Sequence, residues 1–356
     1  MKVKKILVVI LCFLVLTACE VINQYGKPEN FKYFSGKTSM KEIDIKQIND
    51  QQFIPVNDLI SSVDGSFTYD RLHRTLKMEI DNQGYKLIYG IPVIERNGVY
   101  LPIDTVKLLE YEGEVYLPVH FLETVLGLDV SLLDAKVKFP WTNETLVVST
   151  IESISILEKD WTVGEMIDYL SFLQKPLEDA TVSTIPNHLP GAKRPYRNGF
   201  HEGIDWYAYA SGQHISITTP VFGMADGVVV RADHDYVEYP SSEVRDQDLA
   251  LTALVGETPE YIFDRLRGKQ VWVQYENGVM NRFAHLYAIP ENIKVGEKVT
   301  SSTVIGYVGN SGTSGAVNND GTQLHLHQDI LVYGEQFWKP FTLEETLQIV
   351  VGIFGK

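Results

Sequence analysis

Two side chains in one short segment could bind a metal ion together. His201 and Asp205 stand in the segment FHEGID, with three residues between them. Gly203, Ile204 and Trp206 favour an extended chain here, and in an extended chain positions four apart point to the same face. We therefore predict that His201 and Asp205 can share one metal ion on a rigid backbone. This pattern differs from the helical His-Glu-x-x-His of many zinc proteases.

Three further histidines lie in or near strand-like segments downstream. His325 and His327 stand in LHLHQDI, where alternation with period two puts both imidazoles on one face of a strand. His285 stands in RFAHLY, after the apolar run QVWVQY. Neither spacing is specific alone, since nine histidines in 356 residues produce such pairs by chance. The ordered set is more specific, because short apolar segments with glycine turns separate its members.

The segment from Phe200 to Ile330 resembles the LytM/lysostaphin-type zinc endopeptidases, which cut bacterial peptidoglycan. The resemblance rests on the histidine and aspartate motifs above and on the spacers TPV, ADGV, VGEKV and IGYVGNSG between them. It implies one zinc ion per chain and an antiparallel β-sheet domain over residues 191–345. The implied zinc ligands are His201, Asp205 and His327, and the implied catalytic pair beside the zinc is His285 and His325.

The chemistry of these residue types agrees with that implication. Two imidazole nitrogens and one carboxylate oxygen leave a fourth tetrahedral position for water, as in catalytic zinc sites. Zinc lowers the pKa of such a water to about 7 and polarises a carbonyl group. A neighbouring histidine can take the proton, and a second can stabilise the oxyanion. We assign His325 as the base, because it shares a strand face with His327, and His285 as the stabiliser; the sequence also permits the reverse.

The sequence departs from the resemblance at two notable places. Gln328 follows the last histidine, where the family usually has an aromatic or aliphatic residue. Residues 231–269 form an insertion with helical patterns at 242–255 and 259–267, the second predicted to begin at a Thr258 cap. We expect this insertion to reshape one wall of the substrate groove, so the substrate preference of the family does not transfer directly.

An internal repeat marks residues 46–155. The segments FIPV, YLPI and YLPV each place a proline after a strand-like pair, with an apolar residue four positions further on. Because proline ends a strand and suits the first turn of a helix, each copy predicts a strand followed by a short helix. This stretch resembles the copper-amine-oxidase N-terminal-like stalk domain of secreted Gram-positive proteins. We predict no copper site, because His73 and His120 lack a second histidine at ligand spacing, and we interpret the domain as a spacer or wall-binding module.

The first residues are typical of a bacterial secretory signal. Residues 1–18 comprise a lysine-rich start and an apolar run of 11 residues, too short to span a membrane. The LTAC at the end of this segment resembles a lipobox, which implies that Cys19 is lipidated and becomes the mature N-terminus; an uncleaved anchor is the alternative. Residues 19–45 are predicted to be a tether. Both interpretations put the body outside the cytoplasm, and lipidation would anchor it to the outer face of a Gram-positive cell membrane, facing the wall.

The charge of the chain argues against nucleic-acid binding. Acidic residues number 46 and basic residues 31, so the net charge is −15, or −18 once the three lysines of residues 1–18 are removed. Such a chain repels nucleic-acid phosphates. The only cysteines are Cys12 and Cys19, which excludes a thiolate zinc site in the body of the protein.

The expected fold class is α+β, mainly β. It combines an antiparallel LytM-type catalytic sheet, a helical insertion and a small α+β repeat-bearing stalk domain. Residues 156–190 are predicted to be a helical connector whose helix is capped by Thr162. Residues 346–356 are predicted to be a C-terminal tail, which continues an amphipathic helix capped by Thr342.

The sequence therefore predicts a zinc-dependent endopeptidase that hydrolyses peptide bonds of peptidoglycan through a zinc-activated water. Its partners would be peptidoglycan peptides and, through the lipid anchor, the membrane. The alternative is a catalytically silent wall-binding or regulatory lipoprotein on the same fold. Such a protein has no need of His285 and His325, so the presence of both favours the enzyme. A peptidase that acts in sporulation or regulates autolysins would be the same class of enzyme, and the scissile bond is left open.

Overall fold

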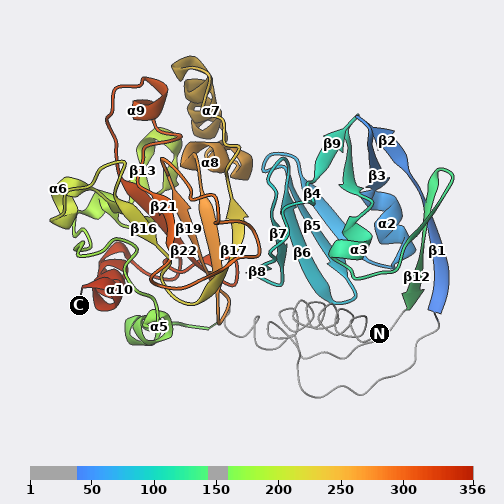
Figure 1. The fold of residues 1–356 in the computed structure, drawn as a ribbon, viewed down its shortest axis with the longest axis horizontal. Helices are drawn as coiled ribbons and strands as arrows, with labels where there is room; N and C mark the ends of the chain where they lie inside the picture. Colours follow the sequence, from blue (N-terminus) through green and yellow to red (C-terminus); the bar gives the residue numbers. More distant parts are fainter. Residues whose placement is uncertain (1–37, 143–158, 356) are drawn as a thin grey trace, which may run out of the picture.

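The chain forms two bodies that lie side by side (Figure 1). This computed structural model describes residues 38–142 and 159–355, which we call the N-terminal unit and the C-terminal unit. The predicted signal segment, the predicted lipidation at Cys19 and most of the predicted tether lie outside the described residues. Across the two units, no helix combines the length and the apolar character needed to cross a membrane.

Two of the three proline repeats in the N-terminal unit continue from a strand into a helix, as predicted. The two strands pair antiparallel, with Phe53 opposite Pro118. A strand on each side completes a four-stranded sheet. The elements are β2 (Lys46–Ile48), β3 (Gln51–Pro55) with α2 (Val56–Ser62), β9 (Leu109–Tyr111), and β10 (Glu114–Pro118) with α3 (Phe121–Thr124).

The prediction of a helix after the middle repeat is wrong. β8 (Val99–Tyr100) is followed by irregular chain, in which the backbone N–H of Ile103 donates to the carbonyl of Leu101 at 2.8 Å. This hydrogen bond closes a γ-turn across Pro102, and a γ-turn holds the backbone away from helical angles. Val106, four positions past the proline, is buried like its counterparts in the other two copies. The repeat therefore conserves the apolar anchor but not the helix.

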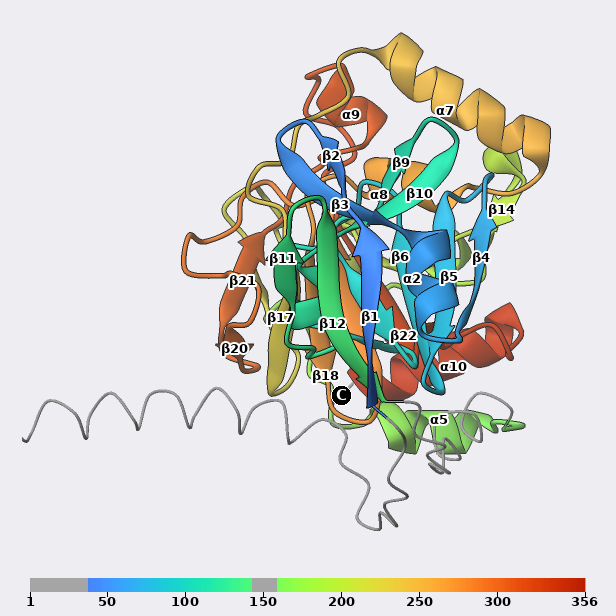
Figure 2. The ribbon, with the colours of Figure 1, turned by 90° about the vertical axis from the view of Figure 1, so that its right-hand side faces the viewer.

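Two further sheets complete the N-terminal unit. One is a five-stranded antiparallel meander in which each strand pairs with the next: β4 (Ser66–Asp70), β5 (Thr75–Ile80), β6 (Gln83–Ile88), β7 (Ile94–Arg96) and β8. In the other, β12 (Lys136–Thr142) pairs with β1 (Thr38–Asp44) on one side and β11 (Ser131–Leu133) on the other. Thr38 lies opposite Thr142, so the chain enters and leaves this unit at one place (Figure 2). β1 occupies residues predicted to end the tether.

The C-terminal unit is built on a seven-stranded antiparallel sheet with the strand order β15-β22-β19-β18-β17-β20 and β23 paired to β22. Its strands are β15 (Ile204–Trp206), β17 (Gly227–Ala232), β18 (Val271–Tyr275), β19 (Val279–Ala284), β20 (Lys298–Val299), β22 (Leu326–Val332) and β23 (Glu335–Gln336). Two small ribbons flank it: β13 (Lys193–Arg194) with β14 (Gly199–Phe200), and β16 (Pro220–Phe222) with β21 (Val304–Tyr307). The antiparallel, mainly β fold is the one predicted.

Two helices cover the inner face of this sheet. α5 (Val163–Leu170) and α10 (Leu343–Phe354) begin at capping boxes on Thr162 and Thr342, as predicted. Met166 and Leu170 of α5 pack in the same core as Trp206, so the segment predicted as a connector contributes to the hydrophobic core of the C-terminal unit. The short helices of this unit are α6 (Ala208–Ser211), α9 (Ser314–Val317) and the 3-10 turns η1 (Pro186–His188) and η2 (Pro195–Arg197).

The N-terminal unit covers the outer face of the same sheet. Ile91, Val93 and Tyr100 pack in one apolar cluster with Trp272 and Leu331. The Tyr100 ring stands edge-on to the Trp272 ring, with 5.3 Å between their centroids. Every residue of β18, β19 and β22 is buried in consequence. The unit that the sequence presents as a spacer is thus packed directly onto the sheet that carries the histidines.

The insertion forms two helices at the predicted positions, α7 (Ser242–Val255) and α8 (Glu260–Arg267), drawn at the top of Figure 1. The predicted Thr258 cap is wrong, because Pro259 is the N-cap residue of α8. The Thr258 hydroxyl instead accepts a hydrogen bond from the guanidinium of Arg197 at 3.1 Å. This contact ties the insertion to the turn that precedes His201.

Candidate active site

Strand register brings the predicted ligands together. Asp205 on β15 lies directly opposite His327 on β22, and His327 lies opposite Ala284, the last residue of β19. His285 follows Ala284 in a left-handed conformation, with φ of 59°, which turns the chain at the end of the strand. The strands β15 and β19, which both pair with β22, thus place Asp205 and His285 near His327 at one end of the sheet.

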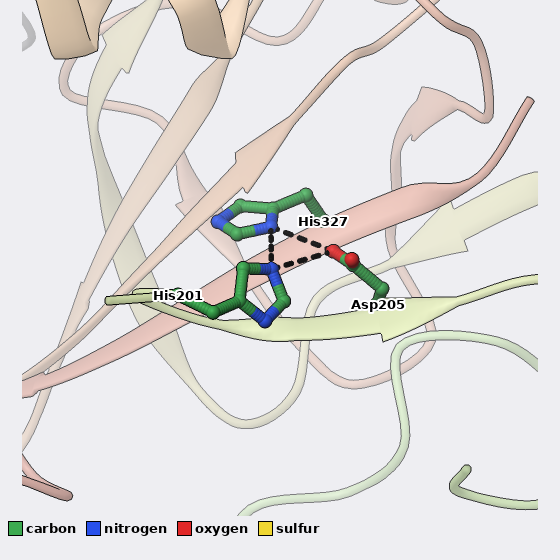
Figure 3. A group of neighbouring side chains, drawn as sticks. All are labelled: His201, Asp205 and His327. Atoms are coloured by element: carbon green, nitrogen blue, oxygen red, sulfur yellow. Dashed lines mark hydrogen bonds and ion pairs between the residues drawn. The ribbon is translucent and has the colours of Figure 1, made fainter. Parts of the chain in front are cut away.

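His201, Asp205 and His327 converge on one point (Figure 3). His201 Nε2 lies 3.0 Å from Asp205 Oδ1 and 3.2 Å from His327 Nδ1, and His327 Nδ1 lies 2.8 Å from Asp205 Oδ1. All three side chains are buried. Adjacent ligand atoms around a tetrahedral zinc ion stand about 3.3 Å apart, given zinc–ligand bonds of about 2.0–2.2 Å. The spacing of the three atoms is therefore close to one face of a zinc tetrahedron.

Each of the two ligand histidines has one ring nitrogen at the common point, His201 Nε2 and His327 Nδ1, which we call the inner nitrogen. The other ring nitrogen of each, the outer nitrogen, is hydrogen-bonded and fixes the orientation of the ring. His201 Nδ1 donates to the Leu189 carbonyl at 3.1 Å, and His327 Nε2 donates to Asp329 Oδ1 at 2.7 Å. Such partners hold a metal-binding imidazole in the correct tautomer and orientation. The inner nitrogens of both rings and an oxygen of Asp205 then point at one another, an arrangement that a cation between them would stabilise.

Electrostatics support the same conclusion. Burial lowers the pKa of His327, but Asp329 and Asp205 outweigh it and raise the pKa to about 9. Burial raises the pKa of Asp205, but His201 and His325 outweigh it and hold that pKa well below the usual range. The carboxylates of Asp205 and Asp329 thus favour positive charge at this point. The donor set of two imidazoles and one carboxylate fits zinc.

The predicted catalytic pair faces the same point. His285 Nδ1 donates to the Ser311 carbonyl and His325 Nδ1 donates to the Gln323 carbonyl, both at 2.7 Å. Each ring is therefore left with an Nε2 lone pair that can accept a proton. The two ring centroids lie 4.7 Å apart. Structure and sequence thus agree that both histidines are available beside the candidate metal ligands.

The surroundings of the two histidines differ. His325 Nε2 lies 3.5 Å from Asp205 Oδ1, and its ring stacks on Tyr207 with 4.3 Å between centroids and 10° between planes. Burial and the neighbouring histidines hold the pKa of His285 well below its ordinary value. His325 therefore lies beside a carboxylate, whereas burial and two neighbouring imidazoles disfavour a proton on His285.

A cavity of about 270 Å³ opens over these five residues. Its walls include Arg245 and Leu249 of α7 and Phe263 of α8, so the insertion lines one side, as expected. Tyr196 also lies in this wall and is 60% exposed. The wall also contains Arg194, whose guanidinium lies 3.7 Å from Asp205 Oδ2.

Several site residues were not found from the sequence. Tyr207, Arg194 and Asp329 have no motif of their own, although the alternation that groups His325 with His327 also puts Asp329 on that face. His188, which belongs to none of the sequence motifs above, is buried and bonded to Ser183 Oγ at 2.8 Å and to the Tyr209 hydroxyl at 2.9 Å. Outside this site, the His120 ring bonds the Thr105 carbonyl at 3.1 Å.

Gln328, the first departure from the family pattern, has a structural explanation. Its side chain points to the core face of β22, opposite to His327. It accepts a hydrogen bond from Trp206 Nε1 at 3.0 Å and donates to Asn281 Oδ1 at 3.3 Å. A buried amide is tolerated when its polar atoms have partners.

Replacing Gly203 with alanine is expected to disturb the site through its backbone. A Cβ at this position would lie 2.3 Å from the Gln328 carbonyl oxygen and 2.7 Å from Asp329 Oδ1, so β15 and β22 would have to separate. Overpacking of this kind costs about 1–3 kcal/mol. Urea unfolding should show a lower midpoint and zinc titration a weaker affinity. Gly164→Ala is the matched control, because a Cβ there meets nothing within 4 Å. An unchanged Gly203→Ala protein would contradict the described packing.

Two family models match parts of the chain. Residues 250–337 match peptidase family M23, and residues 36–139 match the copper amine oxidase N-terminal domain. The M23 range contains His285, His325 and His327, whereas His201 and Asp205 lie N-terminal to it. No curated protein matches the chain.

Solved structures that are similar to parts of this chain have low identity to it. Lysostaphin from Staphylococcus simulans is 20% identical over 47% of this chain and 49% of its own, with a TM-score of 0.26. A mutant catalytic domain of the prophage-encoded M23 protein EnpA from Enterococcus faecalis is 17% identical over 46% and 92%, with a TM-score of 0.28. A zinc-containing peptidase from Vibrio cholerae is 15% identical over 86% and 72%, with a TM-score of 0.30. The roles of individual residues therefore rest on the geometry of this chain.

Proposed function

We propose that this chain, which carries a domain of peptidase family M23, is a zinc-dependent endopeptidase that hydrolyses peptide bonds of bacterial peptidoglycan. The observation that carries the proposal is the convergence of His201 Nε2, His327 Nδ1 and Asp205 Oδ1 within 3.2 Å of one another, with two further imidazoles beside them. We propose His201, Asp205 and His327 as the ligands of one zinc ion per chain. His285 and His325 are the proposed catalytic residues.

The proposed mechanism uses these residues in a fixed order. A zinc ion held by the three ligands would lower the pKa of a bound water to about 7 and polarise the scissile carbonyl. His325 accepts the water proton at Nε2, since its Nδ1 already donates to the Gln323 carbonyl and Asp205 stabilises the resulting imidazolium. It then donates that proton to the leaving amine. His285 faces the same space and would stabilise the developing oxyanion through an Nε2–H, which it carries only when the ring takes a second proton or when Nδ1 releases the Ser311 carbonyl.

The proposed location is the outer face of the cell membrane, with the peptidase facing the wall. The support for it is the sequence of residues 1–19 alone: a lysine-rich start, a short apolar run and a lipobox-like LTAC. A lipid on Cys19 would hold the enzyme near its substrate at a high effective concentration. Labelling cells with a fatty-acid probe should mark the wild-type chain and leave Cys19→Ala unmarked. Labelling of both chains, or of neither, would exclude a lipid at this cysteine.

The direct test is product analysis on defined peptidoglycan fragments. The chain from residue 20 onward is purified and its zinc content is measured, and the products of each fragment are identified by mass spectrometry. We expect one zinc ion per chain and new amine ends at one type of peptide bond, which would also identify that bond. Bound zinc without cleavage of any stem peptide, cross-link or bridge would instead support the catalytically silent wall-binding protein.

A further inference from the structure

A tyrosine of the N-terminal unit lies on the same face of the sheet as His327 and Asp329. Tyr100, at the end of β8, is 3% exposed. Its backbone N–H donates to Gln274 Oε1 at 3.0 Å, and its hydroxyl accepts a hydrogen bond from Arg282 Nη2 at 3.1 Å. Both partners belong to the C-terminal unit, so Tyr100 is hydrogen-bonded across the contact between the two units at two points.

Arg282 connects this hydroxyl to a buried carboxylate. Its Nη1 lies 3.8 Å from Asp329 Oδ2, and its guanidinium stacks over the Trp272 ring at 4.4 Å. Within the described part of the chain, Arg282 Nε is buried without a hydrogen-bond partner. The Tyr100 hydroxyl is therefore an important acceptor for a buried and incompletely satisfied cation, and such cations depend strongly on the partners they have.

Asp329 carries the connection to the metal centre. Its side chain is completely buried, with Oδ2 bound to Arg267 Nε at 3.0 Å and Oδ1 bound to His327 Nε2 at 2.7 Å. The two arginines hold the carboxylate from one side while His327 donates to it from the other. An uninterrupted series of polar contacts therefore runs from Tyr100 through Arg282 and Asp329 to His327.

We propose that Tyr100 is a positioning residue of the metal centre, and that the N-terminal unit is thereby part of the catalytic machinery. The proposal rests on the proposed function, because it takes His327 to be a zinc ligand. Without the hydroxyl, Arg282 must find its acceptor elsewhere, and the nearest carboxylate oxygen is Asp329 Oδ2. A closer approach there draws negative charge away from Oδ1. The hydrogen bond to His327 weakens, and the imidazole becomes a poorer and less firmly held ligand.

The test is Tyr100→Phe, which removes the hydroxyl and keeps the ring on Trp272. Zinc affinity is measured by competition with a chelator on the chain from residue 20 onward. Loss of a direct outer partner of a ligand typically costs 10–100-fold in metal affinity, so one step further out we expect a loss of about 3–10-fold. Tyr69→Phe is the matched control, because its hydroxyl bonds Glu110 at 3.0 Å within the N-terminal unit. We expect that variant to bind zinc as the wild type does.

A double-mutant cycle separates coupling from general damage. Asp329→Asn should weaken zinc binding by about 10–100-fold, and adding Tyr100→Phe to it should have no further effect, because the path is already broken. Additive losses, or a Tyr100→Phe affinity equal to that of the wild type, would overturn the proposal. If the wild type binds no zinc at this site, the proposed function fails instead.

A second readout does not depend on bound zinc. In the metal-free chain, the nitrogen and proton signals of the His327 Nε2–H group report its hydrogen bond to Asp329. We expect these NMR signals to shift in Tyr100→Phe and to stay in place in Tyr69→Phe. Unchanged signals in Tyr100→Phe would show that the contact between the units does not reach the metal centre, even if that variant were less stable.

Discussion

Replacing His327 with alanine is expected to remove bound zinc and reduce peptide hydrolysis by on the order of 10⁴-fold or more. The change deletes one of three proposed ligands and leaves Asp329 without its imidazole partner. Water that no longer has zinc beside it returns to its much higher ordinary pKa, so hydroxide is not available at neutral pH. Metal analysis and a cleavage assay on the same preparation check both parts of the expectation.

His214→Ala is the control for this prediction, since that histidine is exposed and lies in the same unit. It should retain one zinc ion per chain and wild-type activity. A His327→Ala protein that keeps its zinc at wild-type affinity would show that the ion is held elsewhere. One that loses zinc while retaining hydrolysis would show that the reaction does not use this centre.

Alanine at His325 or His285 is expected to lower kcat by about 10²–10⁴-fold while the zinc content stays at one ion per chain. Neither ring belongs to the three converging ligands, and each presents Nε2 to the cavity while Nδ1 donates to a carbonyl. The larger loss is expected for His325, because it is the proposed base and its Nε2 lies 3.5 Å from Oδ1 of the proposed zinc ligand Asp205. Steady-state kinetics on the cleaved fragment give kcat and KM for each variant.

The outcome that contradicts this second prediction is specific. If both variants retain the wild-type kcat, proton transfer at this centre does not involve the histidine pair. If His285→Ala is the more severe variant, the roles of the two residues are reversed, which the sequence alone permits. Loss of zinc in either variant would make that histidine part of the ligand set.

The candidate site was predictable because its residues sit in short motifs with strand periodicity. Alternation in LHLHQDI is a local property, and it groups His325 with His327 without knowledge of the rest of the fold. The approach of Asp205 to His327 depends on strand pairing across 122 residues, and the structure has the two opposite each other. The spacing of the motifs identifies the candidate residues, whereas the register of the paired strands determines the distances between their side chains.

Two of the three features that could not be predicted depend on contacts between distant parts of the chain. Thr258 has the sequence context of a helix cap but is bonded to Arg197, 61 residues away. The middle proline repeat has the same local pattern as its neighbours, yet its chain follows a γ-turn. The alternating pattern of β18 does not show that a second unit covers its outer face. For Thr258 and for β18, local propensity is overridden by a partner that the sequence does not identify.

Because β1 pairs with β12, the two ends of the N-terminal unit lie side by side, and the unit could be deleted as one segment. Thr38 and Thr142 stand opposite each other, and their hydroxyls are 2.8 Å apart, so residues 38–142 can be excised in a gene with a simple join. Deleting this unit is nevertheless expected to lower the solubility of the protein, because it uncovers the outer face of the seven-stranded sheet. It would expose a contiguous patch that includes Trp272, Met280 and Leu331, and patches of that kind promote aggregation. Truncations made to isolate the peptidase should therefore keep this unit or replace those three side chains with polar ones.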